Sequence, residues 1–120
     1  MARFVIVDDH GDLDIYSSIE DARADLEVID VENSEYVIYD DLGNLIEAEI
    51  ELSRGEKRFG STKIITFIST EVNEADNLML IIQQYLMKVG SIPLDSSFPL
   101  HELVFRLAKF QGLTEKELDE

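Results

Sequence analysis

The sequence contains no cysteine and no tryptophan, and it has only two prolines and ten basic residues. Without cysteine there can be no disulfide and no thiolate zinc site, and the chain suits a reducing compartment such as the cytoplasm. The longest apolar run, 78–82, ends at two glutamines and is far too short to span a membrane. Residues 1–8 lack the apolar core of a signal peptide. We therefore expect a cytoplasmic protein that makes no contact with a membrane.

The charge of the chain is strongly acidic and unevenly distributed. Twenty-six acidic residues against ten basic ones give a net charge of −16 over 120 residues. The first part, Met1–Leu52, has sixteen acidic and two basic residues, a net −14, and the remainder has ten and eight, a net −2. This imbalance predicts repulsion from nucleic acid and anionic lipid, and attraction to basic protein surfaces. A hydrophobic content of 45% still predicts a folded chain, and the length predicts one domain over residues 1–120.

The most clearly patterned stretch of the sequence is Leu45–Leu52. Alternate residues are apolar, and the residues between them are acidic. A strand with this pattern buries one face and exposes the other. The buried face would carry Ile46, Ala48, Ile50 and Leu52, and the exposed face would carry Glu47, Glu49 and Glu51. Carboxylates two residues apart on one strand repel each other, so either a function or solubility has to account for this row.

The other elements follow from periodicity and from turn and capping residues. Strands are expected at 3–7, 12–16, 35–39 and 63–69, with an extended segment at 28–31. Helices are expected from a capping box at Ser17 to about residue 27, from Thr70 or Asn73 to Val89, and from Pro99 to Gly112. The helix ending at Val89 is apolar nearly all round, which predicts a core helix or part of a dimer contact. This order predicts the α+β class: a mostly antiparallel sheet with helices packed on one face.

The sequence contains no motif that indicates catalysis. The acidic run 8–14 does not have the spacing of a calcium-binding loop, so we interpret it as a hairpin turn. His10 and His101 are the only histidines, and neither a Gly-x-Ser-x-Gly motif nor a glycine-rich phosphate loop is present. We therefore expect no catalytic residue, no metal ligand and no cofactor. A small enzyme or ligand-binding domain that uses the acidic turns is retained as a competing class.

Part of the first half resembles a known group of proteins. The resemblance is carried by Gly11–Ala22, by Leu26–Asn33, by Glu35-Tyr36 and Tyr39-Asp40, and by Gly43. These residues resemble small bacterial immunity proteins of polymorphic toxin systems, including contact-dependent growth inhibition. The resemblance implies a protein that binds one cognate toxin in the cytoplasm and blocks it. It transfers no catalytic residue, and many of the toxins are nucleases with basic substrate grooves.

These observations predict a protein that uses acidic residues to occupy the groove of a basic toxin domain, a nuclease above all. The predicted contact residues are Glu47, Glu49 and Glu51, with Asp40 and Asp41 at the adjacent turn and Asp12 and Asp14 nearby. The basic loop 53–60 is a further candidate contact. The alternative is an acidic regulatory adaptor or nucleic-acid mimic that binds another basic protein. In either case we expect a monomer or weak dimer with no direct contact to nucleic acid.

Overall fold

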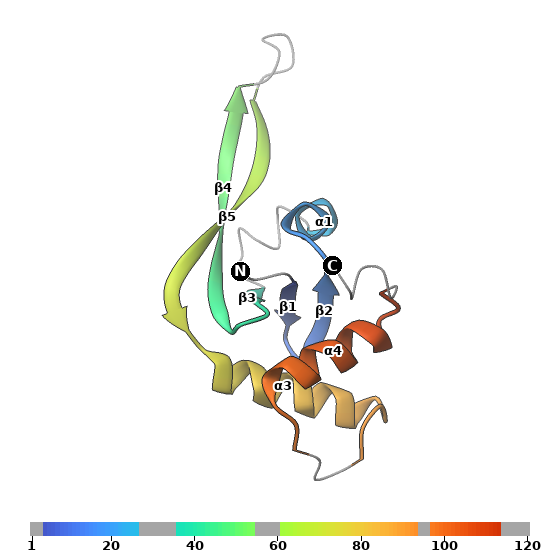
Figure 1. Cartoon of the computed structure of the whole chain (residues 1–120). Helices are drawn as coiled ribbons and strands as arrows, with labels where there is room; N and C mark the ends of the chain where they lie inside the picture. The colour runs from blue at the N-terminus through green and yellow to red at the C-terminus, as the bar shows by residue number, and fades with distance from the viewer. Residues whose placement is uncertain (1–3, 27–35, 55–60, 94–96, 114–120) are drawn as a thin grey trace.

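The computed structural model describes residues 4–26, 36–54, 61–93 and 97–113, and the side chains of all of these except 51–54 and 61–64. A five-stranded antiparallel sheet, with strand order β2-β1-β3-β4-β5, packs with three described helices (Figure 1). This confirms the α+β class and the antiparallel sheet. The strands are β1 Val5–Asp9, β2 Asp12–Tyr16, β3 Val37–Asp40, β4 Asn44–Arg54 and β5 Ser61–Asn73, and the helices are α1 Ile19–Asp25, α3 Ala75–Lys88 and α4 Leu100–Phe110.

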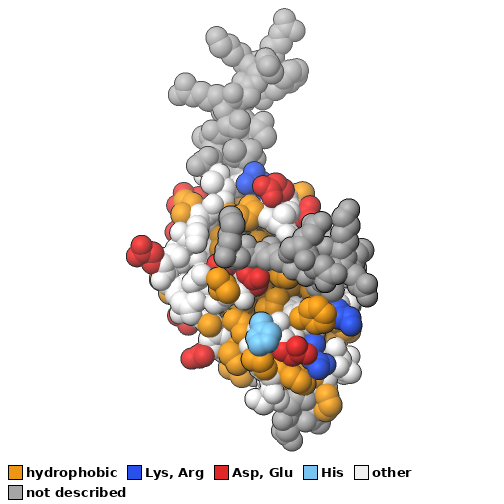
Figure 2. All heavy atoms as spheres, viewed as in Figure 1, with side chains coloured by type: hydrophobic (Ala, Val, Ile, Leu, Met, Phe, Trp, Pro, Cys, Tyr) orange, Lys and Arg blue, Asp and Glu red, His pale blue; other side chains and the backbone are white. Residues whose placement is uncertain are grey.

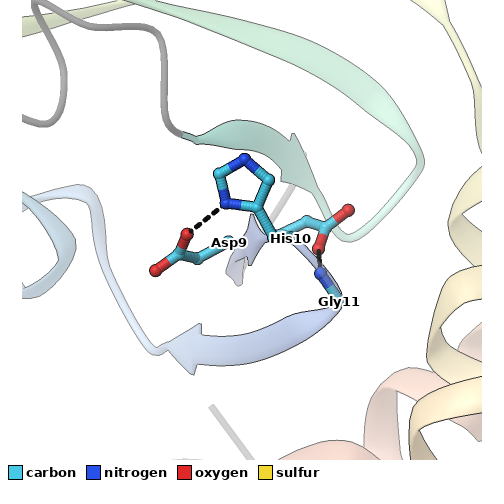
Figure 3. A network of polar contacts seen from close by, with 4 residues as sticks. Asp9, His10 and Gly11 are labelled. Atoms are coloured by element: carbon cyan, nitrogen blue, oxygen red, sulfur yellow. Dashed lines mark hydrogen bonds and ion pairs between the residues drawn. The ribbon is translucent and has the colours of Figure 1, made fainter.

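The acidic run 8–14 forms the β1–β2 hairpin, as predicted. His10 and Gly11 form its two-residue turn with φ angles of 53° and 98°, and two positive φ angles are typical of the type I′ turn that suits strand twist. The Gly11 amide donates to Asp8 Oδ1 at 2.8 Å, and His10 Nδ1 lies 3.0 Å from Asp9 Oδ1 (Figure 3). The carboxylates therefore stabilise the turn itself.

Helix α1 begins one residue later than the predicted capping box indicates. Ser18, not Ser17, is the N-cap, and its hydroxyl accepts a hydrogen bond from the Asp21 amide at 3.1 Å. The Ser17 hydroxyl contacts the Asp21 carboxylate instead, at 3.0 Å. Both serines precede the same apolar residues, so the sequence alone does not distinguish them.

The sheet has an apolar core on each face. On one face, α3 and α4 pack against Phe4, Ile6 and Tyr39, with Leu78, Ile82, Leu86, Leu103 and Leu107 fully buried. The prediction that helices pack on one face of the sheet therefore holds for α3 and α4 but not for α1, and α3 is a core helix. Helix α1 adds a smaller core on the opposite face, where Ala22 and Leu26 pack with Val5, Val7 and Ile38.

The β4–β5 hairpin extends well beyond the rest of the sheet. β4 has 11 residues and β5 has 13, whereas β3 has only 4. The hairpin consequently projects as an arm from the body of the molecule, whose extents are 56 × 29 × 26 Å (Figure 1). The expected extended segment at 28–31, most of the basic loop 53–60 and the expected final turn near Thr114 lie outside the described residues.

Candidate partner-binding surface

The acidic face of β4 is open to solvent where the structure describes its side chains. Glu47 and Glu49 are exposed. Ile46, Ala48 and Ile50 point the other way and pack with the core beneath α1. The predicted alternation is therefore confirmed over residues 46–50. The side chains of Glu51 and Leu52 lie outside the described part of the chain. Helix α3 packs on the face of the sheet that carries Glu47 and Glu49, but at another part of that face, so it leaves both glutamates exposed.

Exposed apolar side chains lie beside these two glutamates. Glu47 pairs with Ile68 across the β4–β5 ladder, and Val37 lies on the same face of the neighbouring strand β3. Ile68 is 41% exposed and Val37 is 45% exposed. We call Val37, Glu47, Glu49 and Ile68 the arm surface. Figure 2 shows acidic side chains projecting from the margin of the molecule on the side of the arm and the start of α3. An apolar patch beside charges is a typical composition for a protein interface.

A cleft opens at one side of the arm surface because β3 and β4 diverge. Their described pairing consists of Ile38 with Ile46 and Tyr39 with Leu45. Beyond these pairs β4 continues alone with β5, which leaves a cleft of about 350 Å³ lined by Tyr36, Val37, Ile38, Leu45, Ile46, Glu47, Ala48 and Thr70. Its wall is mostly apolar, and Glu47 supplies a carboxylate. The cleft can therefore accept a long side chain that has an apolar stem and a cationic end.

The structure gives Asp40 a different role from the predicted one. Its side chain is buried, with 7% exposed. Its carboxylate accepts hydrogen bonds from the backbone amides of Leu42 and Asn44, both at 2.9 Å, and from Asn44 Nδ2 at 3.0 Å. A carboxylate that is occupied in this way holds the β3–β4 turn together and is not free to contact a partner. Asp41, in the same turn, is half-buried.

Replacing Asp40 by alanine is expected to destabilise the fold. The substitution leaves the turn amides of Leu42 and Asn44 without their acceptor, and a lost hydrogen bond to a charged group costs about 1.5–3 kcal/mol. We expect Asp40→Ala to lower the free energy of unfolding by about 2 kcal/mol, measured by urea denaturation. Asp12→Ala is the control, because it removes an exposed carboxylate at the start of β2. An equal loss in the control would show that the Asp40 carboxylate has no special role in the turn.

Asp12 and Asp14 lie far from the arm surface. Both belong to β2, the edge strand at the other end of the sheet. Asp14 pairs with Val7 and shares the face covered by α1, whereas Glu47 lies on the opposite face. Partial burial raises the pKa of Asp14, and the nearby carboxylates of Asp25, Asp12 and Asp9 raise it further. These clustered carboxylates form a second acidic region, which a partner seated on the arm surface does not reach.

Tyr16 closes this second acidic region on the side of α1. Its hydroxyl donates to Asp25 Oδ2 at 2.5 Å. Burial, followed by this hydrogen bond to a carboxylate, raises the pKa of the Tyr16 hydroxyl. The contact attaches the end of α1 to β2, so the region has a structural function of its own.

Exposed aromatic rings on α4 form a cluster that no motif in the sequence indicates. Phe105 and Phe110 are both exposed. The Lys109 ammonium lies 5.5 Å from the centre of the Phe105 ring, and the Arg106 guanidinium lies 4.2 Å from that of Phe98. Such cation–π contacts stabilise exposed rings. Lys109 therefore covers the exposed Phe105 ring, and the Phe110 ring packs edge-to-face against Tyr85, with the ring centres 6.1 Å apart.

The described residues offer no metal site and no membrane span. Among them, no group of three or more His, Asp or Glu side chains is arranged to hold a metal ion. None of the helices in the described ranges is long and apolar enough to cross a membrane. The sequence matches no protein-family model, and no curated protein or solved structure is significantly similar to it. The function is therefore inferred from the surface of the molecule itself.

Proposed function

We propose that this protein binds a basic protein domain through the arm surface and blocks its activity, as an immunity protein does with its cognate toxin in the cytoplasm. The observation that carries the proposal is the exposure of Glu47 and Glu49 beside Val37 and Ile68 on a face that no described helix covers at this point. The net charge of −16 and the resemblance of residues 11–43 to immunity proteins support the same role. A nuclease is the best-fitting partner because its substrate groove must be basic to hold a phosphate backbone.

The arm surface combines the two features that such an interface needs. Carboxylates opposite a basic groove steer the approach of the two proteins and reject acidic partners. Apolar side chains at the centre exclude water, which strengthens the nearby charge pairs. Glu47 and Ile68 are cross-strand neighbours, so both features occur at one place. A projecting hairpin can also enter a groove that a flat surface cannot reach.

The cleft beside Glu47 provides an anchoring position for one partner residue. A lysine or arginine of the toxin would place its aliphatic stem against Val37 and Leu45, which line the cleft on the Glu47 face, and its cationic end on the Glu47 carboxylate. The cleft volume of about 350 Å³ is ample for one such side chain. This contact would be the most thoroughly desolvated charge pair of the interface, and it would therefore affect the dissociation rate more than the association rate.

A nucleic-acid mimic or regulatory adaptor would also bind a basic protein, but it would differ from an immunity protein in how many partners it binds and in whether it protects cells. A mimic imitates a regular row of phosphates, and it would bind several unrelated nucleic-acid-binding proteins. An immunity protein binds one toxin and protects cells against it. No described feature favours the mimic, since the acidic side chains are divided between the arm surface and the β2 region on opposite faces of the sheet.

The proposal is tested by capture from the native host followed by an inhibition assay. The tagged protein is expected to retain one basic toxin domain, to inhibit its purified form at equimolar ratio, and to protect cells that produce the toxin. A variant with lysine at both Glu47 and Glu49 should lose the inhibition while remaining folded by circular dichroism. Capture of several nucleic-acid-binding proteins without any protection of growth would favour the mimic instead.

A further inference from the structure

The exposed side of α4 carries cations and aromatic rings in an otherwise acidic molecule. A hollow of about 410 Å³ lies against it, which we call the α4 groove, lined by Ser91, Glu102, Phe105, Arg106, Lys109 and Phe110. The described side chains include four Lys or Arg, which are Arg23, Lys88, Arg106 and Lys109. Two of these four line the groove, and Figure 2 shows basic side chains among apolar ones over α4. In a chain with a net charge of −16, this composition differs from that of the acidic surfaces.

The helix period places the two cations between the two exposed rings. Successive residues of an α-helix are about 100° apart around its axis. Relative to Phe105, Lys109 lies at about 40° and Arg106 at about 100°. Phe110 follows at about 140°. The remaining circumference carries the buried residues Leu103, Val104, Leu107 and Ala108. The exposed stripe of α4 therefore presents, in order, a ring, two cations and a second ring.

Both cations keep donors available for a ligand. The Arg106 guanidinium donates through Nε to Glu102 Oε1 at 3.0 Å and lies over the Phe98 ring. These two contacts hold it in place, while its terminal amino groups make no hydrogen bond within the described part of the chain. The Lys109 ammonium contacts the Phe105 ring, but no described carboxylate pairs with it. Side chains three residues apart on a helix are neighbours, so one anion can contact Arg106 and Lys109 together.

We propose that the α4 groove binds a segment of an acidic partner protein in which one Asp or Glu stands between two apolar residues. The carboxylate would bridge Arg106 and Lys109 through charge-assisted hydrogen bonds. The apolar side chains would pack on the exposed parts of the Phe105 and Phe110 rings and exclude water from the charge pairs.

An extended segment has the dimensions that this arrangement requires. Residues two positions before and two positions after the acid lie on the same side of the segment as the acid, and they are about 13 Å apart. Phe105 and Phe110 are separated by about 7.5 Å along the helix axis, and they lie on the two sides of the cation pair. A segment that crosses α4 obliquely therefore reaches both rings while its carboxylate lies over the cations.

A nucleic acid fits the same groove less well. Single-stranded nucleic acids are also bound by cations and aromatic rings, but they carry a phosphate for every base. A molecule with a net charge of −16 repels such a polyanion over most of its surface. A protein segment with a single carboxylate brings one negative charge to the two cations, so the charge balance favours the protein segment.

The α4 groove and the arm surface select partners of opposite charge. The arm surface lies on β3, β4 and β5, and the groove lies on α4 and at Ser91, so the two share no residue. A basic domain on the arm surface gains no attraction from Arg106 and Lys109. The inference therefore goes beyond the proposed function, and it can hold or fail independently of it.

The groove is tested by nuclear magnetic resonance of the whole isotope-labelled chain. The probe is the blocked peptide Ser-Leu-Gly-Asp-Gly-Leu-Ser, whose only charge is the aspartate. We expect saturable shifts of the amide signals of residues 102–110. The same peptide with asparagine in place of aspartate should bind about fivefold more weakly or less, because its hydrogen bonds to the two cations lose the charge of the acceptor.

Lys109→Glu should weaken binding of the aspartate peptide by about tenfold, since a like charge then faces the ligand. Arg23→Glu is the matched control, because it makes the same charge reversal on α1, which packs on the opposite face of the sheet, and should leave binding unchanged. If Lys109→Glu does not fold, the comparison of the two peptides on the wild-type protein still decides the matter.

Three results would overturn the proposal. An absence of shifts at the highest soluble peptide concentration would show that the groove is not a binding site. Equal binding of the aspartate and asparagine peptides would show that no acid is recognised. Tighter binding of a short oligothymidylate, with shifts at the same residues, would replace the acidic protein segment by a single-stranded nucleic acid.

Discussion

Changing Glu47, Glu49 and Glu51 together to glutamine is expected to weaken binding of the cognate basic partner by about tenfold or more, because charge pairs at the interface lose one member. Glutamine has nearly the shape of glutamate, so packing is preserved. Removal of three like charges from one strand also relieves repulsion, so the variant should be at least as stable as the wild type. The measurement is the dissociation constant at several salt concentrations.

The control for this prediction comes from the second acidic region. Replacing Asp12, Asp14 and Asp25 by asparagine removes the same charge on the opposite face of the sheet. If the arm surface is the contact, this control changes the association rate slightly and leaves the dissociation rate unchanged. Equal weakening by both triple variants would mean that total charge, and not the arm surface, attracts the partner. Unchanged affinity in the arm variant would place recognition elsewhere, for example on the loop 53–60 or on the C-terminal helices.

Local features of the fold could be predicted from the sequence because neighbouring residues determine them. Alternation fixes the two faces of β4 whatever surrounds the strand. Gly11 marks the β1–β2 turn because that turn requires a positive φ angle. Pro99 and Gly112 delimit α4 because proline begins helices and glycine ends them. In each of these elements, the structure depends on the conformational preferences of residues that are close together in the sequence, so the sequence pattern predicts it.

Features that depend on distant residues could not be predicted in this way. Whether Glu47 and Glu49 are covered depends on where α3 ends its contact with the sheet. The hydrogen bonds of the Asp40 carboxylate are local, to residues two and four positions later, but the burial of its side chain is set by tertiary packing. The position of Asp14 beside Asp25 is set in the same way. An aspartate in the sequence does not indicate whether its side chain will be buried, since aspartate is equally common in exposed turns. Gln111 gives no sequence sign that it covers the edge of β2, 96 residues from its partner Ile15.

Gly43 holds the junction that connects the arm to the body, and its substitution is expected to have the largest effect on stability. It lies in the β3–β4 turn with a φ angle of 89°. Its carbonyl accepts from the Glu74 amide at 2.7 Å, at the start of α3. A Cβ atom at this position would lie 2.4 Å from the Ala75 Cα atom and 2.7 Å from its Cβ atom. Both of these atoms are fixed parts of a helix, so α3 or the turn would have to move.

We expect Gly43→Ala to lower the free energy of unfolding by about 3 kcal/mol or more, since left-handed backbone strain and overpacking against α3 add together. Gly11→Ala separates these two causes. Gly11 has a similar φ angle of 98°, but a Cβ atom added to it would meet no other atom within 4 Å, so only the backbone strain of about 1–2 kcal/mol applies. Urea denaturation measures both variants, and equal losses would show that the contact with Ala75 relaxes without cost. Because the turn sets the start of β4, a folded Gly43→Ala protein should also bind its partner more weakly than Gly11→Ala does.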